Sequence, residues 1–155
     1  MYHYTDGGLC NVWLVNGYEV KQTPFGEAVS FHDIDGLTQA ICTALTEKSG
    51  KLSGVEFRYI RSGGMLLSQP NLGKMIGIDE QSVARWEKTG KVPRWADKLM
   101  RLLYSAQVQG NVPICRVIER INKVERMVKQ KIVVQENRGR WSPKIQDDES
   151  IVEMA

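Results

Sequence analysis

The chain contains few of the residues that build metal sites or disulfide frameworks. Its 155 residues include three cysteines and two histidines. Cys10, Cys42 and Cys115 are odd in number, far apart and in no CxxC pair, and His3 and His32 are too few for a zinc site. We therefore expect reduced cysteines that serve as packing residues in a reducing compartment, with no metal and no other cofactor.

Signals for export, membrane insertion and catalysis are also absent. The N-terminus shows no basic region followed by an apolar run, so no signal peptide is predicted. No run approaches the roughly 20 apolar residues of a membrane span. Asp33 and Asp35 form a carboxylate pair, but they have no partner histidine or metal set, and a helix-capping role is favoured. We expect a cytoplasmic protein that is not an enzyme.

The charge of the chain is unevenly distributed. Composition is ordinary for a globular protein, with 42% hydrophobic and 25% charged residues, and the net charge is +3. Residues 53–140 contain 17 basic and 8 acidic side chains, whereas residues 1–52 and 141–155 each carry a net −3. A basic middle between acidic ends suggests a segment that faces a polyanion, although a solvated surface would also account for these totals.

Residues 1–50 are predicted to form a small β-meander followed by one helix. Asn16-Gly17, between NVWLV and YEVKQT, is typical of a type I′ hairpin, and residues 23–26 predict a second turn before the strand EAVSF. Side chains expected on the buried face are Trp13, Tyr18, Val20, Val29 and Phe31. An aromatic ligand surface is the weaker alternative to core packing.

A helix is predicted within residues 33–50, because Leu37, Ile41 and Leu45 recur every four residues and Gly50 can close it. Residues 51–53 are the expected link to a second module. There, SGVEFRYIRSGG predicts a helix that ends at the paired glycines, with Val55, Tyr59 and Ile60 facing inward. Pro93 predicts the start of a later helix, whose inward residues are Ala96, Leu99, Leu102 and Leu103.

Between these lie two short predicted helices. Ser68 and Asp79 are suitable N-caps, Pro70 suits a first turn, and Gly77 can end the first helix with positive φ. The inward residues are Leu72, Met75 and Ile76 in the first helix, then Val83 and Trp86 in the second. The opposite face of the second helix carries an amide, a hydroxyl and a guanidinium, which are the groups that contact bases in the major groove.

A helix–turn–helix domain is predicted over residues 53–106. Residues 53–104 resemble the helix–turn–helix of the Cro/phage-repressor-like class, through the segments LSGVEFRYIR (which begins at Leu52), LSQPNLGKMIG, VARWEK and RLL. More narrowly, they are similar to the DNA-binding domain of MqsA/YgiT-type antitoxins, over about a third of the chain. This chain departs in two ways: the Gly63-Gly64 link is one residue longer, and the CxxC motifs of the family's zinc-binding N-terminal module are absent. The toxin-binding role of that module is therefore not carried over.

The resemblance implies roles for individual residues. Expected base contacts are Gln81, Ser82 and Arg85, since glutamine suits adenine and arginine suits guanine. Expected phosphate contacts are Ser68, Gln69, Lys88, Lys91 and Arg94. Arg61 and Glu87 match a structural ion pair of the class. The alternative for these charged residues is an ordinary solvated helix face.

Residues 112–135 are predicted to form a C-terminal amphipathic helix, because Ile114, Ile121 and Val128 recur every seven residues. This seam could pair with a second copy or fold back onto the N-terminal module, and a membrane-surface role is weaker because the segment lacks Trp and Phe. Residues 136–155 are expected to be a polar, flexible tail.

These patterns predict an α+β chain with an all-α helix–turn–helix domain. The expected function is a sequence-specific regulator of transcription that binds double-stranded DNA, as a homodimeric repressor at a palindromic operator in a bacterium or phage. The alternative is an antitoxin-like protein that neutralises a partner toxin through its N-terminal module or C-terminal segment and represses its own operon.

Overall fold

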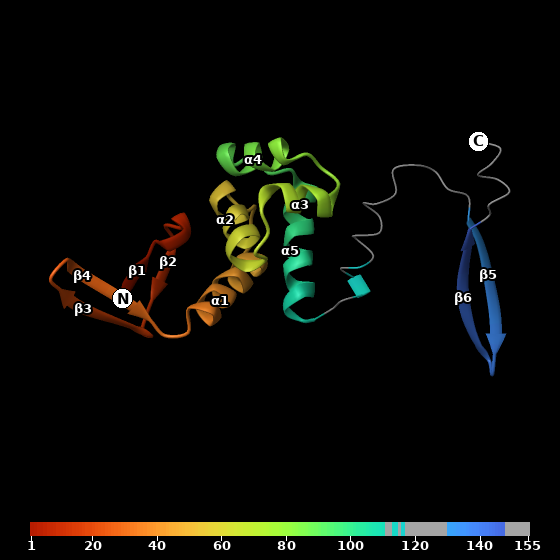
Figure 1. The fold of residues 1–155 in the computed structure, drawn as a ribbon, viewed down its shortest axis with the longest axis horizontal. Coiled ribbons are helices and arrows are strands. Elements are labelled where there is room, and N and C mark those ends of the chain that lie inside the picture. The colour runs from red at the N-terminus through yellow and green to blue at the C-terminus, as the bar shows by residue number, and fades with distance from the viewer. Residues whose placement is uncertain (111–112, 115, 117–129, 148–155) are drawn as a thin grey trace. The chain divides into compact units, whose positions relative to one another are not determined.

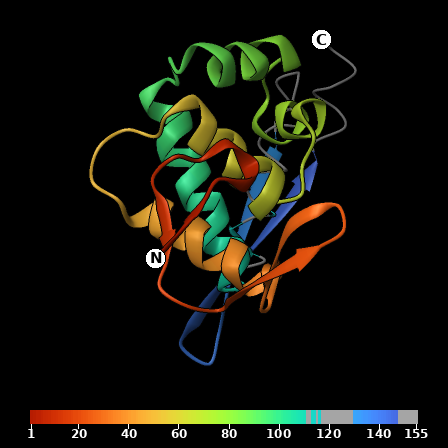
Figure 2. The ribbon, with the colours of Figure 1, turned by 90° about the vertical axis from the view of Figure 1, so that its left-hand side faces the viewer.

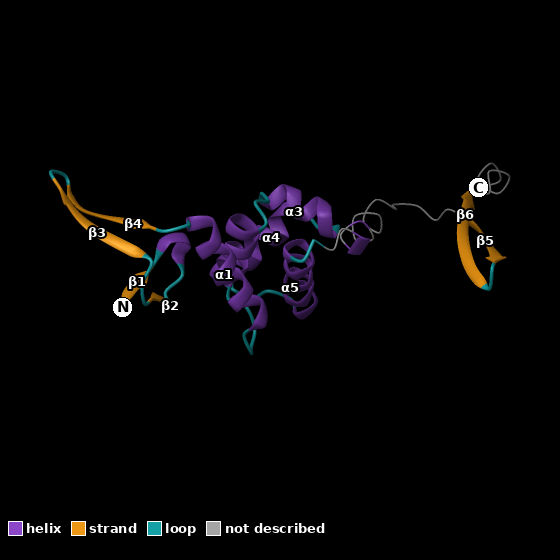
Figure 3. Cartoon of the chain, turned by 90° about the horizontal axis from the view of Figure 1, so that it is seen from below, coloured by secondary structure: helices purple, strands orange, loops and turns teal. Residues whose placement is uncertain are grey.

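The computed structural model describes residues 1–110, 113–114, 116 and 130–147. Two compact units, Met1–Asn122 and Lys123–Ala155, are described separately below. Their described residues form small antiparallel strand pairs and five α-helices, so the predicted α+β class is confirmed (Figure 1, Figure 3).

The first unit contains, in chain order, β1 (Tyr2–Tyr4), the 3₁₀ turn η1 (Asp6–Gly8), β2 (Val12–Leu14), β3 (Tyr18–Thr23), β4 (Gly26–Phe31), α1 (Ile34–Glu47), α2 (Gly54–Arg58), the π-helical turn η2 (Tyr59–Gly64), α3 (Gln69–Ile76), α4 (Glu80–Thr89) and α5 (Arg94–Val108). The second unit contains β5 (Gln130–Asn137) and β6 (Arg140–Asp147).

The predicted meander is wrong in its pairing. β1 pairs with β2, and β3 pairs with β4 around the turn at residues 23–26, as two separate antiparallel pairs. Asn16-Gly17 is therefore a connection between the two pairs and not a hairpin turn. The N-terminal strand β1, which the sequence pattern did not reveal, pairs with β2 from Tyr2↔Leu14 to Tyr4↔Val12. The hairpin preference of Asn16-Gly17 is local and does not decide which strands pair. The Gly17 carbonyl instead accepts from the His32 amide at 2.8 Å, at the base of the β3–β4 hairpin.

The expected buried face of these strands is also partly wrong. Val12 and Leu14 pack against the core, while Trp13 is 56% exposed and stacks on the His3 ring at 4.0 Å between ring centroids. Val20 is 45% exposed. Side chains alternate across a strand, and β2 offers apolar residues on both of its faces, so pattern alone left the inward face open.

The helix predicted within residues 33–50 is confirmed as α1. Asp33 accepts a hydrogen bond from the Gly36 amide at 3.1 Å, as an N-cap does, and Ile41 and Leu45 are buried. This helix packs against α5 and η2 (Figure 1, Figure 2).

Residues 1–50 do not form a module with a core of their own. One hydrophobic cluster extends from Tyr4 on β1 through Leu45 on α1 to Leu103 on α5. Leu52, in the expected link, is 1% exposed and belongs to the same cluster. The N-terminal strands and the helices therefore share a single core.

The helix predicted before the paired glycines begins at Gly54 as α2 and then widens into the π-helical turn η2. Such a turn accommodates one additional residue within a helix. Both glycines of the Gly63-Gly64 pair lie within this turn. Val55, expected to face inward, is 41% exposed, and Phe57 is buried instead.

Helix α5 begins after Pro93, as predicted, but its inward face differs by one position. Ala96 and Leu103 are buried, and Met100 and Tyr104 complete the face, whereas Leu102 is 52% exposed. The helical period of 3.6 residues places residues 96, 100 and 103 on one side, which turns Leu102 outward.

The second unit is a β-hairpin and not the end of a helix. β5 and β6 pair from Gln130↔Asp147 to Asn137↔Arg140, so the helix predicted to residue 135 is wrong over residues 130–135, and the predicted tail contains strands. Arg138 and Gly139 both have positive φ, at 54° and 76°, as a type I′ turn requires, and the β-branched run of β5 favours strand. The seam positions 117–129 lie outside the described residues.

The cysteine prediction holds for one of two described positions. Cys42 is a buried packing residue, and burial raises its pKa to about 11 against a smaller lowering by its hydrogen bond with Tyr104. Cys10 is exposed. Among the described residues, no three His, Cys, Asp or Glu side chains gather as metal ligands, and none of the described helices is long and apolar enough to cross a bilayer.

The shared core predicts different costs for the same substitution at two leucines. Leu45→Ala should lower the free energy of unfolding by about 2–5 kcal/mol, because it opens a cavity in the hydrophobic cluster that α1 shares with the other helices. Leu102→Ala removes the same atoms from an exposed site and should change stability by about 0.5 kcal/mol or less. Urea unfolding of both variants tests this, and equal losses would contradict the burial of Leu45 in the core.

Candidate nucleic-acid interface

Local capping sets the bounds of α3 and α4. The Ser68 hydroxyl accepts from the Asn71 amide at 3.2 Å, and the Asp79 carboxylate accepts from the Ser82 amide at 2.7 Å. Between the helices, Gly77 has φ 73°, a conformation that costs glycine little. These bonds stabilise the first turns of α3 and α4. Gly77 ends α3, and α4 begins three residues later at Glu80.

The turn between α3 and α4 is closely packed. A Cβ atom at Gly73 would lie 2.5 Å from the Ile78 carbonyl oxygen, so only glycine lets α3 approach the turn this closely. Leu72 of α3 and Val83 of α4 are fully buried next to this contact. The orientation of α4 relative to α3 is therefore fixed by packing.

One face of α4 is buried and the other faces solvent. Val83 is fully buried, and Trp86 is 5% exposed and packs edge-on against the Phe57 and Trp95 rings. On the solvent side, Gln81, Arg85 and Lys88 are exposed and Ser82 is half-buried. The residues predicted to contact bases thus lie together on the solvent face of a short helix.

The Arg85 guanidinium lies along α4. Its Nη2 donates to the Ser82 hydroxyl oxygen at 3.3 Å. Hydrogen bonds from the Ser82 backbone and side chain, and the charge of Arg85, hold the pKa of Asp79 below its usual range. A guanidinium has five N–H donors, so the single bond to Ser82 leaves a fork that can bind a planar acceptor edge.

Arg61 and Glu87 form the ion pair that the resemblance implies. Arg61 donates from Nε to Glu87 Oε2 at 2.6 Å and from Nη2 to Oε1 at 2.9 Å, and its Nη1 donates to the Leu67 carbonyl at 2.7 Å. Both side chains are over nine-tenths buried. The pair therefore ties η2 to α4 and to the segment that leads into α3, and it faces away from solvent.

Gln69 joins this network. Its Nε2 donates to Glu87 Oε1 at 3.0 Å, which places the expected phosphate-binding amide on a carboxylate. The amide group carries a second N–H, so this contact and a phosphate contact are compatible. Sequence reasoning identified the residue but missed its bond to Glu87, which depends on how α3 and α4 fold together.

The basic loop after α4 is held at its centre. Lys91 and Arg94 are exposed, whereas Val92 between them is fully buried. At the end of α4, the Thr89 hydroxyl donates to the Arg85 carbonyl at 2.7 Å and accepts from the Lys91 amide at 3.3 Å. The buried valine and these bonds present the two cations to solvent from a fixed backbone.

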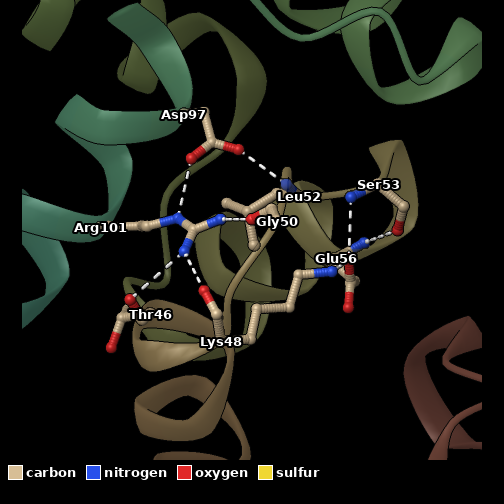
Figure 4. Close-up of polar contacts among 8 residues, drawn as sticks. All are labelled: Thr46, Lys48, Gly50, Leu52, Ser53, Glu56, Asp97 and Arg101. Atoms are coloured by element: carbon tan, nitrogen blue, oxygen red, sulfur yellow. Dashed lines mark hydrogen bonds and ion pairs between the residues drawn. The ribbon is translucent and has the colours of Figure 1, made fainter. Parts of the chain in front are cut away.

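A second polar network, which sequence reasoning missed, joins α5 to the link between α1 and α2 (Figure 4). Asp97 is 2.7 Å from Arg101 Nε and accepts from the Leu52 amide at 2.7 Å. Arg101 also donates to the Lys48 carbonyl at 2.7 Å and to the Gly50 carbonyl. The i,i+4 spacing of Asp97 and Arg101 was the available signal for the ion pair.

The start of α2 is fixed on the other side of the link. Ser53 and Glu56 form a reciprocal capping box, and Lys48 donates to Glu56 at 2.6 Å (Figure 4). Burial raises the pKa of Glu56, but the hydrogen bonds from Lys48 and Ser53 outweigh it and hold the pKa below its ordinary value. The residues expected to form a simple link are thus held at both ends.

The arrangement exposes an amide and a guanidinium on α4 and cations after it, on a framework held by the buried Arg61–Glu87 ion pair. Comparisons of the chain with protein-family models, with curated proteins and with solved structures found no match. The assignment of the site therefore depends on the chemistry and placement of its own residues.

The buried ion pair makes a test of the framework. Glu87→Gln leaves the Arg61 charge buried without its anion and should lower the free energy of unfolding by about 3–5 kcal/mol. Glu27→Gln, the same change at an exposed position of β4, should cost about 0.5 kcal/mol or less. Thermal or urea unfolding compares the two, and a Glu87→Gln variant as stable as Glu27→Gln would show that the pair does not hold α4.

Proposed function

We propose that this chain is a sequence-specific regulator of transcription in which α3 and α4 act as a helix–turn–helix of the Cro/repressor-like class on double-stranded DNA. The observation that carries the proposal is the solvent face of α4. Gln81 and Arg85 are exposed there, opposite the buried Val83 and Trp86. A major groove about 12 Å wide admits such a helix.

In this proposal, three residues of α4 contact bases. Gln81 suits the paired donor and acceptor of adenine, and Arg85 suits the two acceptors of guanine. The bond from Arg85 to the Ser82 hydroxyl sets the starting direction of the guanidinium. Ser82 can then donate its own hydroxyl proton to a base acceptor.

Phosphate contacts flank these residues on both sides. Ser68 and Gln69 lie at the N-terminal end of α3, where backbone N–H groups favour an anion. Lys88, Lys91 and Arg94 are exposed along the end of α4 and the loop after it. Contacts to phosphate fix the protein on the duplex without selecting a sequence.

A single short helix contacts only a few base pairs, so we propose a homodimer at a palindromic operator. Two-fold symmetry would place the half-sites about one helical turn apart, roughly 34 Å. Occupancy of such a site over a promoter would repress transcription, in the cytoplasm of a bacterium or in a cell infected by a phage.

A protein-binding role beside DNA binding is favoured by a separate observation. Apolar side chains on and between the N-terminal strands face solvent: Trp13 is 56%, Val15 76% and Phe25 100% exposed. A contiguous exposed apolar patch marks a protein contact, and these three residues are the candidates for one near β2 and at the β3–β4 turn. An antitoxin that binds its toxin there and represses its own operon would combine both roles.

Selection of bound duplexes from a random DNA library, at stated salt, tests DNA recognition directly. An enriched palindromic motif is expected, and its half-site spacing would measure the separation of the two copies of α4. Recovery of no motif, under conditions in which the protein is folded, would contradict sequence-specific binding.

Two variants separate the proposed roles on the selected operator. Arg85→Ala should cost about 1–3 kcal/mol and relax preference at one base position, whereas Lys91→Ala should weaken all sequences alike. Arg58→Ala, an exposed arginine of α2, is the matched control and should bind like the wild type. Uniform loss of affinity for every operator variant in both mutants would contradict the division between base and phosphate contacts.

A further inference from the structure

A cavity beside the first turns of α5 carries a second group of basic side chains. It has a volume of about 550 Å³, and its lining residues are Gly50, Lys51, Arg94, Asp97, Lys98 and Arg101. Its walls come from the α1–α2 link on one side and from α5 on the other. Lys51, Lys98 and the cavity itself take no part in the contacts proposed above.

The cavity has an excess of positive charge. Asp97 and Arg101 neutralise each other through their 2.7 Å ion pair. Lys51, Arg94 and Lys98 are exposed, and across the part of the chain that the structure describes no carboxylate forms an ion pair with any of the three. Three exposed cations around one hollow, paired with none of the described carboxylates, favour an anionic ligand.

The wall that carries Lys51 is fixed in place. Arg101 binds the Gly50 carbonyl, and Asp97 binds the Leu52 amide, so the backbone on each side of Lys51 is attached to α5 (Figure 4). The Leu52 side chain is 1% exposed in the core. Binding an anion therefore requires little ordering of the backbone, which lowers the entropic cost of the contact.

The lining indicates the chemistry of the ligand. It contains no aromatic side chain on which a base or ring could stack. Two lysine ammonium groups and one guanidinium are the groups with which proteins bind phosphate. The cavity thus suits phosphate groups, from a DNA backbone or from a small phosphorylated molecule.

Continuity with the proposed interface favours the DNA backbone. Arg94 lines the cavity and also ends the basic loop that begins at Lys91. We infer that Lys51 and Lys98 bind backbone phosphates that flank the bases contacted by α4, so that the phosphate-binding surface extends from the loop onto the α1–α2 link. This inference rests on the proposed function, because it assumes that α4 binds DNA.

Phosphate contacts are independent of sequence, so the test can use a mixed-sequence duplex of about three helical turns. Lys51→Gln and Lys98→Gln should each weaken binding roughly three- to tenfold at ~50 mM salt. Each should also reduce the slope of log affinity against log salt by about 0.9. Lys21→Gln, the same change at an exposed residue of β3, is the matched control and should match the wild type. Unchanged thermal unfolding of all three variants verifies the fold.

Two further measurements identify the source of the phosphate. Duplexes that carry the selected operator at their centre, shortened from their ends, should lose the effect of Lys51→Gln and Lys98→Gln before they lose the effect of Arg85→Ala. Calorimetric titration of the full chain with pyrophosphate should show only weak binding. Tight pyrophosphate binding that the two lysine variants abolish, with DNA affinity unchanged, would overturn the backbone assignment in favour of a small phosphorylated ligand.

The outcomes separate this inference from the proposed function. If the wild type binds DNA with a preference that depends on Arg85, and both lysine variants bind like Lys21→Gln, the inference fails and the proposed function stands. If the wild type binds no duplex, both fail together. The extended surface is supported only if both lysine variants, and not Lys21→Gln, show a lower DNA affinity and a smaller slope of log affinity against log salt.

Discussion

The structure around α4 depends on the buried contact between Arg61 and Glu87. The Glu87 carboxylate accepts two hydrogen bonds from the Arg61 guanidinium, and both side chains are buried. Such a buried pair is stable only when the backbone places the two groups in the correct geometry. Arg61 also binds the Leu67 carbonyl, and Glu87 also accepts from Gln69. One ion pair therefore positions η2, the start of α3 and the last turns of α4, and the solvent face of α4 takes its direction from this contact.

A second ion pair has the same role for the other end of the helical region. Asp97 and Arg101 fasten the link between α1 and α2 to α5 through backbone bonds, so Leu52 enters the core and Lys51 stays at the surface. Four exposed cations result: Lys91, Arg94, Lys98 and Lys51. The backbone beside Lys91 and Lys51 is fixed by the buried side chains of Val92 and Leu52. Rigid support of this kind places charges without the ordering cost that a mobile loop would add on binding.

Sequence patterns predicted the helices well where capping and periodicity agreed. Asp33, Ser68 and Asp79 cap the helices expected of them, because a cap needs only a side-chain oxygen and the next three residues. Strand pairing was predicted poorly. Asn16-Gly17 has a strong local preference for a hairpin, yet β2 pairs with the distant β1, since which edge a strand meets is decided by the whole chain. The C-terminal hairpin was missed because the heptad spacing of apolar residues outweighed the β-branched run and the Arg138-Gly139 turn.

The sequence by itself determined the types of helix-forming segment, their caps, the buried stripe of Val83 and Trp86, and hence which side chains of α4 face solvent. These depend on residues within one or two turns of each other. Only the tertiary structure decided that residues 1–50 share the core of the helices, that Gln69 binds Glu87, and that Lys51 and Lys98 line one cavity. Each of these joins positions 18 or more residues apart, and such contacts follow from packing of the complete chain, which no local pattern encodes.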